Sequence, residues 1–141
     1  MVHPRTLSKF LVKKAESLDI CGWKQGKCVE LSDGQLWYEY NYVNGKLHGL
    51  CRRWHENGQL HYESNYVNGV RHGLYRVWCS DGQLYYEHNY VNGDEHGLCR
   101  GWCSDGQLFY ECNYVNGVKV WFFKFEKSSY TNNYKHNPYL D

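Results

Sequence analysis

Residues 62–74 read YESNYVNGVRHGL, and this stretch recurs along the chain. Close copies start at Tyr38 and Tyr86, and a fourth copy that starts at Tyr110 keeps the pattern as far as Gly117. Each copy begins 24 residues after the one before it. A fixed period of this length is typical of stacked supersecondary units, so the sequence predicts a repeat protein.

Each unit contains two dipeptides that favour tight turns. Asn-Gly and Asp-Gly favour type I′ turns because both central residues of such a turn need a positive φ. The turn glycines form two sets, Gly45, Gly69, Gly93 and Gly117, and Gly34, Gly58, Gly82 and Gly106. Between the turns lie segments of about ten residues that are rich in Tyr, Trp, Val and Leu, which is strand composition. The sequence therefore predicts an all-β protein, an elongated single-layer antiparallel sheet of stacked 24-residue hairpins.

The flanks differ from the repeats. Five apolar residues near the N-terminus have the spacing of one helix face, Leu7, Phe10, Leu11, Ala15 and Leu18. The ends of a stacked-repeat sheet need a cover, so we expect residues 1–20 to form a short capping helix. We expect residues 21–126 to form the repeat sheet and residues 127–141 to form a polar tail. Alternatively, the N-terminal helix binds a partner or lies on a membrane surface through Lys9, Lys13 and Lys14.

The turn at Asn57 and Gly58 sets the register of its hairpin. With a two-residue loop, Arg52 lies opposite Glu63, Trp54 opposite His61 and Leu50 opposite Asn65. The same arithmetic gives two further Arg-Glu pairs, Arg76 with Glu87 and Arg100 with Glu111. A three-residue loop would shift the register by one residue and move these sets to opposite faces. We expect the two-residue register.

Aromatic side chains make up 18% of the sequence, with 14 Tyr and 6 Trp. Trp and Tyr are the usual energetic anchors of protein interfaces. Six residues are candidates for a partner-binding aromatic row, Trp54, Trp78, Trp102, Trp37, Tyr85 and Phe109. Alternatively, the stacked rings only stabilise the sheet. A single-layer sheet cannot bury both of its faces, however, and the exposed aromatic area favours a partner.

The repeats do not bring catalytic or metal-binding groups together. The sequence has no Walker loop, no Gly-x-Ser-x-Gly elbow and no His-Glu-x-x-His motif. His48, His72 and His96 recur once per unit, about 10 Å apart in a sheet, which is too far to share a metal ion. We expect these histidines to form hydrogen bonds within their own turns. The protein is therefore predicted to be non-catalytic, without a metal or a cofactor.

The seven cysteines are expected to be free thiols. Equivalent positions in adjacent units lie about 10 Å apart, which exceeds the reach of a disulfide. The N-terminal apolar cluster is too short for a secretory signal, and no apolar run approaches the ~20 residues of a membrane span. We therefore expect an intracellular, cytoplasmic protein with reduced cysteines.

The net charge of +1 conceals an uneven distribution. Residues 31–117 contain six basic and ten acidic side chains, and the flanks are basic. An acidic sheet is a poor phosphate binder, so we do not expect nucleic acid as a partner.

The repeat resembles the MORN repeat, whose pattern is roughly Tyr-x-Gly-x-Trp-x-x-Gly-x-x-x-Gly-x-Gly. The first full unit matches it at Tyr38, Glu39, Asn44, Gly45, His48 and Gly49. Three features depart from the pattern: Tyr42 and its equivalents replace the Trp, Cys51, Tyr75 and Cys99 replace the last Gly, and the Gly after Tyr-Glu is replaced by Tyr40, Ser64, His88 and Cys112. The chain is therefore similar to the divergent MORN type of bacterial antitoxin-like proteins and of large DNA viruses of amoebae. The resemblance implies a sheet of stacked hairpins.

These observations predict a scaffold or adapter that mediates protein–protein interaction through an aromatic sheet face. The alternatives are peripheral membrane association through the N-terminal helix and antitoxin-like inhibition of a partner protein. The last strand, which starts at Val118, is rich in aromatic residues and forms the terminal edge of the predicted sheet. Exposed edges are managed by charge, cover or pairing, so a homodimer through this strand is a further alternative.

Overall fold

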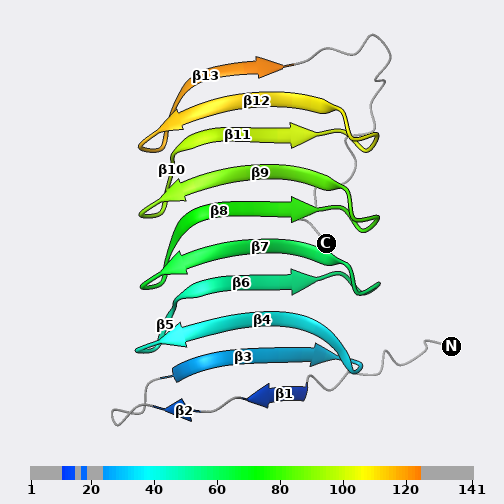
Figure 1. Cartoon of the computed structure of the whole chain (residues 1–141), viewed down its shortest axis with the longest axis vertical. Helices are drawn as coiled ribbons and strands as arrows, with labels where there is room; N and C mark the ends of the chain where they lie inside the picture. Colours follow the sequence, from blue (N-terminus) through cyan, green and yellow to red (C-terminus); the bar gives the residue numbers. More distant parts are fainter. Residues whose placement is uncertain (1–10, 15–16, 19–23, 125–141) are drawn as a thin grey trace, which may run out of the picture.

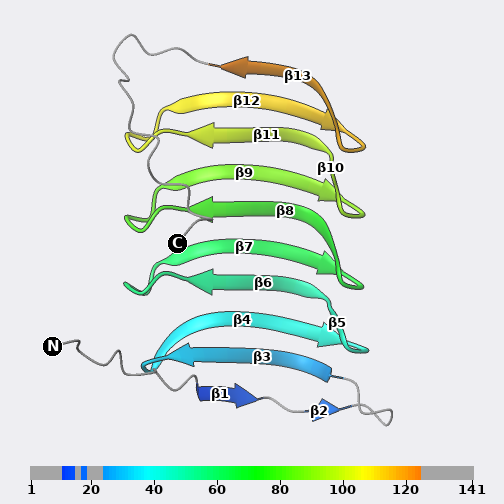
Figure 2. The same ribbon diagram turned by 180° about the vertical axis from the view of Figure 1, so that it is seen from behind.

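The computed structural model describes residues 11–14, 17–18 and 24–124 of the chain. The strands are β1 (Leu11–Lys14), β2 (Ser17–Leu18), β3 (Lys24–Ser32), β4 (Gln35–Val43), β5 (Lys46–Leu47), β6 (Gly49–Trp54), β7 (Leu60–Val67), β8 (Val70–Trp78), β9 (Leu84–Val91), β10 (Asp94–Glu95), β11 (Gly97–Trp102), β12 (Leu108–Val115) and β13 (Val118–Lys124). Every regular element in these ranges is a strand. Figures 1 and 2 show one open layer, seen from its two sides.

The sheet follows the order of the chain. Its main path is β1-β3-β4-β6-β7-β8-β9-β11-β12-β13, and β2, β5 and β10 are short strands that pair with β3, β4 and β9. All neighbours are antiparallel, as successive hairpins require. The predicted single-layer antiparallel sheet is therefore confirmed.

The N-terminal edge differs from the prediction. Leu11–Lys14 form strand β1, which pairs antiparallel with β3 from Leu31 to Cys28. Ser17–Leu18 form β2, so strands stand where a capping helix was expected. The other residues of that helix, and the predicted tail at 127–141, lie outside the described residues. The physical reason is that a strand can pair with the backbone groups at the edge of β3, which a helix cannot do.

The Asn-Gly turns have the predicted geometry. Asn44 has φ 51° and Gly45 has φ 73°, and the three equivalent turns also have two positive φ angles. Two central residues with positive φ define a type I′ turn, whose twist matches that of the flanking strands. The prediction is therefore confirmed for this set of turns.

The second set of turns is different. After β6, the Gly58 N–H donates to the His55 carbonyl at 2.9 Å, and the His55 N–H donates to the Gln59 carbonyl at 2.8 Å. Gly58 has a positive φ but Asn57 does not, which is the pattern of a three-residue loop with glycine at its end. The Asn57 side chain stabilises it by accepting the Gln59 N–H at 3.1 Å. The loops at Gly82 and Gly106 repeat this arrangement, so a two-residue loop was wrong for these three turns; the Gly34 turn alone in this set has two positive φ angles.

A β-bulge compensates for the longer loop. Trp54 pairs with Leu60 and Arg53 pairs with Tyr62, so His61 is an extra residue in its strand. The bulge restores the expected register beyond this point, which confirms the Leu50–Asn65 pair and contradicts the Trp54–His61 pair. The predicted Arg-Glu pairs are also confirmed, Arg52 with Glu63, Arg76 with Glu87 and Arg100 with Glu111.

The sheet has two distinct faces, because side chains alternate along each strand. We call one the tyrosine face; its two rows are Tyr38, Tyr62, Tyr86 and Tyr110, and Tyr42, Tyr66, Tyr90 and Tyr114. We call the other the ladder face, because it carries the Arg-Glu pairs. The buried side chains are few and belong to the tyrosine face, Cys51, Ser64, Tyr75, Val77, Cys99 and Cys112.

Candidate interaction surfaces

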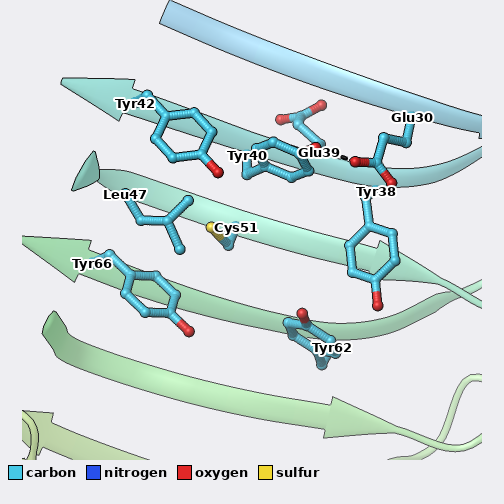
Figure 3. Close-up of a pocket in the computed structure, with 9 residues that line it drawn as sticks. All are labelled: Glu30, Tyr38, Glu39, Tyr40, Tyr42, Leu47, Cys51, Tyr62 and Tyr66. Atoms are coloured by element: carbon cyan, nitrogen blue, oxygen red, sulfur yellow. Dashed lines mark hydrogen bonds between the residues drawn. The ribbon is translucent and has the colours of Figure 1, made fainter. Parts of the chain in front are cut away.

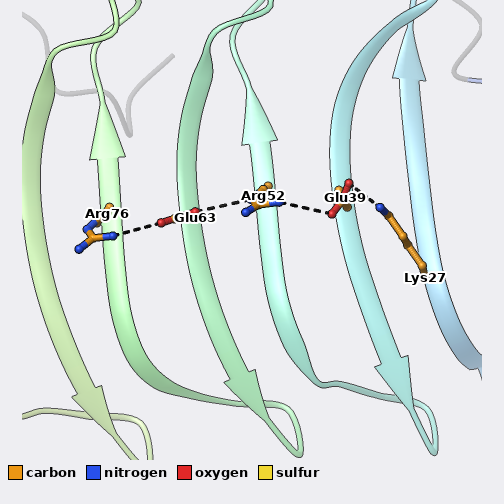
Figure 4. Close-up of polar contacts among 5 residues, drawn as sticks. All are labelled: Lys27, Glu39, Arg52, Glu63 and Arg76. Atoms are coloured by element: carbon orange, nitrogen blue, oxygen red, sulfur yellow. Dashed lines mark hydrogen bonds and ion pairs between the residues drawn. The ribbon is translucent and has the colours of Figure 1, made fainter.

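The ladder face is crossed by a chain of ion pairs (Figure 4). Lys27 Nζ lies 2.9 Å from Glu39, and Arg52 bridges Glu39 and Glu63 at 3.8 and 3.5 Å. Arg76 continues the row, 3.5 Å from Glu63 and 2.6 Å from Glu87. Arg100 and Glu111 form a separate pair at 2.7 Å.

These pairs are partly exposed, and each one alone contributes only about 0–1 kcal/mol. The pKa of the Arg76 guanidinium is raised, chiefly by its hydrogen bond to Glu87. Because each carboxylate has a cationic neighbour, the ladder presents little unpaired charge. It therefore acts as a structural row that also sets the register of neighbouring strands.

The six predicted binding residues do not form one row. Alternation places Trp54, Trp78 and Trp102 on the ladder face with the Arg-Glu pairs. The other three are the extra residues of the β-bulges, and their rings contact the tyrosine rows. Trp37 lies 6.0 Å from Tyr38, Tyr85 lies 5.5 Å from Tyr86, and Phe109 lies 6.1 Å from Tyr110. The bulge is the physical reason for the split, because it interrupts the alternation that the prediction assumed.

The tyrosine face is a network of edge-to-face rings. Tyr75 is its centre, with ring centroids 6.0 Å from Tyr62, 5.6 Å from Tyr86 and 6.2 Å from Tyr90. Burial raises the pKa of Tyr62, and it raises that of Tyr110 to about 12. These phenols are therefore neutral at physiological pH and present hydroxyl groups along with ring faces.

Cations of the chain lie over these rings. The Arg71 guanidinium lies 4.5 Å from the Tyr75 centroid and 5.5 Å from that of Tyr90. Arg71 Nε also donates to the Tyr66 hydroxyl at 3.3 Å. Cation–π attraction of this kind is a recurring mode of recognition for guanidinium and ammonium groups.

The tyrosine face is hollowed near its N-terminal end (Figure 3). The depression has a volume of about 250 Å³ and is lined by Glu30, Tyr38, Glu39, Tyr40, Tyr42, Leu47, Cys51, Tyr62 and Tyr66. The Tyr40 hydroxyl donates a short hydrogen bond to Glu30. Burial, and then this carboxylate, raise the pKa of Tyr40, so its proton is held in the bond. Sequence reasoning missed this site: the sequence shows that Leu47 differs from Arg71 of the next unit, but not that a depression results.

A disulfide joins Cys99 and Cys112 across strands β11 and β12. The prediction that all cysteines are free was therefore wrong for this pair. The predicted pair of Arg100 with Glu111 already places Cys99 opposite Cys112, within reach of a disulfide, whereas equivalent positions in adjacent units are too far apart. Cys28, Cys51, Cys79 and Cys103 are free thiols. The cysteines thus no longer support a reducing compartment.

The recurring histidines connect adjacent units. Nδ1 of His48 accepts the backbone N–H of Asn68 at 3.5 Å, and His72 accepts that of Asn92 at 3.4 Å. The ring bonds reach the turn of the next unit along the chain, whereas the His48 backbone bonds to Asn41 across its own turn. The expectation of bonds within their own turns is therefore confirmed for the backbone and wrong for the rings. The reason is that antiparallel stacking brings each histidine beside the following Asn-Gly turn.

The last strand breaks the repeat. Tyr75 pairs with Ser64, but the residue that pairs with Cys112 is Phe122, one position earlier in the unit than Tyr75. The earlier units contain His-Gly at this bulge, and Gly73 has φ 91°; residues 120–121 are Val and Trp, so the bulge is shorter. As a result, Phe123 lies opposite Glu111, where the ladder would place an arginine, and it is 62% exposed.

Metal-binding groups and membrane-spanning helices are absent from the described ranges. Within them, no group of three or more His, Cys, Asp or Glu side chains could hold a metal ion. His88 and Glu95 form a single close pair at 2.6 Å, and burial lowers the pKa of His88. No helix in the same ranges is long and apolar enough to cross a membrane.

The fold defines a β-hairpin repeat protein with two open faces. The sequence matches the MORN repeat variant at residues 47–68, 71–92 and 95–116. Residues 47–116 of the sheet are therefore three consecutive MORN repeats of the variant type. MORN repeats are in general modules that interact with proteins or membranes.

Other comparisons add less. No curated protein matches the chain. Two solved structures resemble the fold, with titles that name TarM and a GtfA/B complex bound to UDP and GlcNAc. The first has a TM-score of 0.46 and 11% identity over 82% of this chain, and the second 0.45 and 13% over 88%. The matched region spans only 21% and 25% of those two chains.

Proposed function

We propose that the protein is a non-catalytic scaffold or adapter that binds another protein through the tyrosine face of its sheet. One observation carries this proposal. Two rows of tyrosines cover that face, and within the described residues no second layer packs on them. Rings with a polar tip are the usual anchors of protein interfaces. The bulge residues Trp37, Tyr85 and Phe109 extend the same surface.

The ladder face is the less favoured candidate for binding. Its Trp54, Trp78 and Trp102 lie beside a row of paired charges, and its aliphatic residues Leu74 and Leu98 are each 42% exposed. A partner on this face would remove water from the ion pairs, and this desolvation costs free energy. On the tyrosine face the phenols are neutral, and the cations Arg71 and Lys119 lie over rings, so a partner there would cover fewer ion pairs.

The experiment that tests the function is affinity capture of the tagged protein from its native cells, read by mass spectrometry. We expect one stoichiometric protein partner, whose identity separates an adapter from an antitoxin-like inhibitor. Capture should be weakened by Tyr66→Ala on the tyrosine face and unchanged by Leu74→Ala on the ladder face. Recovery of the protein with membrane markers alone, lost on deletion of residues 1–18, would instead support peripheral membrane association.

A second candidate function is self-association through β13. Four apolar residues of this strand are the most exposed of the large hydrophobic residues, Val118, Val120, Phe122 and Phe123. Among the described strands, β13 pairs with β12 alone, and an unpaired edge is a template for another strand. Sedimentation of the purified protein tests this candidate: a dimer that Phe123→Lys converts to a monomer would support it, and a concentration-independent monomer would exclude it.

A further inference from the structure

We propose that the depression on the tyrosine face binds a basic side chain, an arginine or lysine, of the protein partner. The inference deepens the proposed function and rests on it. It assigns one chemical class of ligand to one part of the face, the end lined by Leu47, Tyr40, Tyr42 and Tyr66.

The chain itself shows how such tyrosine clusters are filled. Arg71 extends over Tyr75 and Tyr90. Lys119, two units further on, places its Nζ 5.6 Å from the Tyr114 centroid and 5.1 Å from that of Phe122. Residues 71 and 119 are the same repeat position, which Glu95 takes in the unit between them, where it pairs with His88. A cation therefore covers the rings in two of the four units.

The first unit has the rings but a different residue at that position. Leu47 stands 24 residues before Arg71 and carries no charge. At the centre of the cluster, Cys51 of β6 lies opposite Ser64. The residue of β8 that corresponds to Cys51 is the larger Tyr75. The small side chain of Cys51 and the uncharged side chain of Leu47 therefore leave the depression whose lining residues Figure 3 shows.

A carboxylate in the lining of the depression indicates that the ligand is a cation. Glu30 faces Tyr38 across the strands, and the same register position in the following hairpins is taken by Arg53, Val77 and Gly101. Glu30 lines the depression and accepts one hydrogen bond from Tyr40. A carboxylate oxygen has further acceptor capacity, so Glu30 can accept from a guanidinium or ammonium group.

Two other charged groups border the site. Glu39 lines it, but its carboxylate is bound to Lys27 and Arg52 on the ladder face. The Arg53 guanidinium lies 4.7 Å from the Trp37 centroid and 5.4 Å from that of Tyr38. Arg53 covers the Trp37 and Tyr38 rings and does not line the depression, so the cation of a ligand would lie between the Leu47 end and Glu30, beside Tyr40.

The first test uses small probes on the full-length protein. N-acetyl-arginine methylamide and N-acetyl-lysine methylamide carry the cations, and N-acetyl-norleucine methylamide is the neutral control. In titrations followed by NMR, the cationic probes should shift the resonances of Leu47, Tyr42 and Tyr66. The neutral probe should bind with an affinity at least tenfold lower. Equal binding of the neutral probe, or shifts confined to the ladder face, would overturn the inference.

The second test uses variants that keep the fold. Leu47→Arg supplies from within the cation that Arg71 supplies in the next unit, so probe binding and partner capture should both fall by about tenfold or more. Leu50→Arg adds the same charge on the opposite face and should leave both unchanged. Glu30→Gln keeps the shape and should weaken the cationic probes alone.

The two proposals fail in different ways. If Leu47→Arg blocks the probes but captures the partner as well as the wild type does, the partner does not supply the cation, and this inference is overturned while the scaffold function stands. If the wild type captures no protein at all, the scaffold function fails, and with it the assignment of the cation to a partner.

Discussion

Cys99 and Cys112 lie opposite each other in the sheet, with Cα atoms 5.1 Å apart, and a disulfide joins them. Each side chain is at most 2% exposed, so the bond lies under the tyrosine face. It closes a loop that contains the whole turn between β11 and β12, and it thereby restricts the unfolded chain.

Reduction of this bond should therefore destabilise the sheet. We expect the free energy of unfolding in guanidinium chloride to fall by about 2–4 kcal/mol on reduction. Cys99→Ser/Cys112→Ser should show the lower value with or without reductant, and Cys51→Ser should retain the response. An unfolding midpoint that ignores reductant in the wild type would contradict the assignment.

The histidine that connects two units can be tested by truncation. His72 Nδ1 accepts the Asn92 N–H, so His72→Ala removes the acceptor for a turn amide. We expect a loss of about 0.5–1.5 kcal/mol in the free energy of unfolding. Amide exchange at Asn92 should become faster while exchange at Asn44 is unchanged, and no change at Asn92 would show that the bond does not form in solution.

Gly101 is required for a steric reason. A Cβ at this position would overlap the ring of Tyr110, which covers the backbone there. Alanine normally stabilises a strand relative to glycine, but here the clash should dominate, and Gly101→Ala should cost about 1–3 kcal/mol. In a Tyr110→Leu background the same change should cost less. Thermal unfolding of the four proteins completes this cycle, and equal costs in both backgrounds would rule the clash out.

The stability of the sheet should decrease in mild acid because of His61. Burial, followed by the charges of His55 and Arg53, lowers the pKa of His61 to about 4. The unfolded chain, with a pKa near 6.5, takes up this proton first. Stability is therefore complete above about pH 6.5 and falls as the pH falls towards 4. In denaturation at a series of pH values, His61→Gln should lose less of the free energy of unfolding as the pH falls. An NMR titration that gives His61 a pKa near 6.5 would contradict this explanation.

The repeat itself could be predicted from the sequence because each unit repeats the same local chemistry. Asn44 and Gly45 specify a type I′ turn wherever they occur, and the alternation of Tyr-x-Tyr segments specifies a strand. The Arg52–Glu63 register was also predicted, although through compensation: the loop is one residue longer than expected, and the bulge at His61 restores the pairing. Such cancellation cannot be seen in a sequence, because a bulge has no composition of its own.

The candidate site was harder to predict because it depends on differences between units. The prediction of one six-residue aromatic row was wrong because Trp37, Tyr85 and Phe109 are bulge residues. The depression arises from two departures from the repeat, Leu47 and Cys51, whose effect appears only when the side chains of three strands are placed together. The disulfide follows from the predicted register, because the pair of Arg100 with Glu111 places Cys99 opposite Cys112.

The most direct test of the account is hydroxyl-radical footprinting of the free protein and of its complex with the captured partner. This method reports the exposure of individual side chains, so it distinguishes the two faces of one strand. We predict that Tyr42, Tyr66 and Leu47 become protected in the complex and that Leu50 and Leu74 keep their free reactivity. Protection of Leu50 and Leu74 with unchanged tyrosines would place the partner on the ladder face and contradict the account.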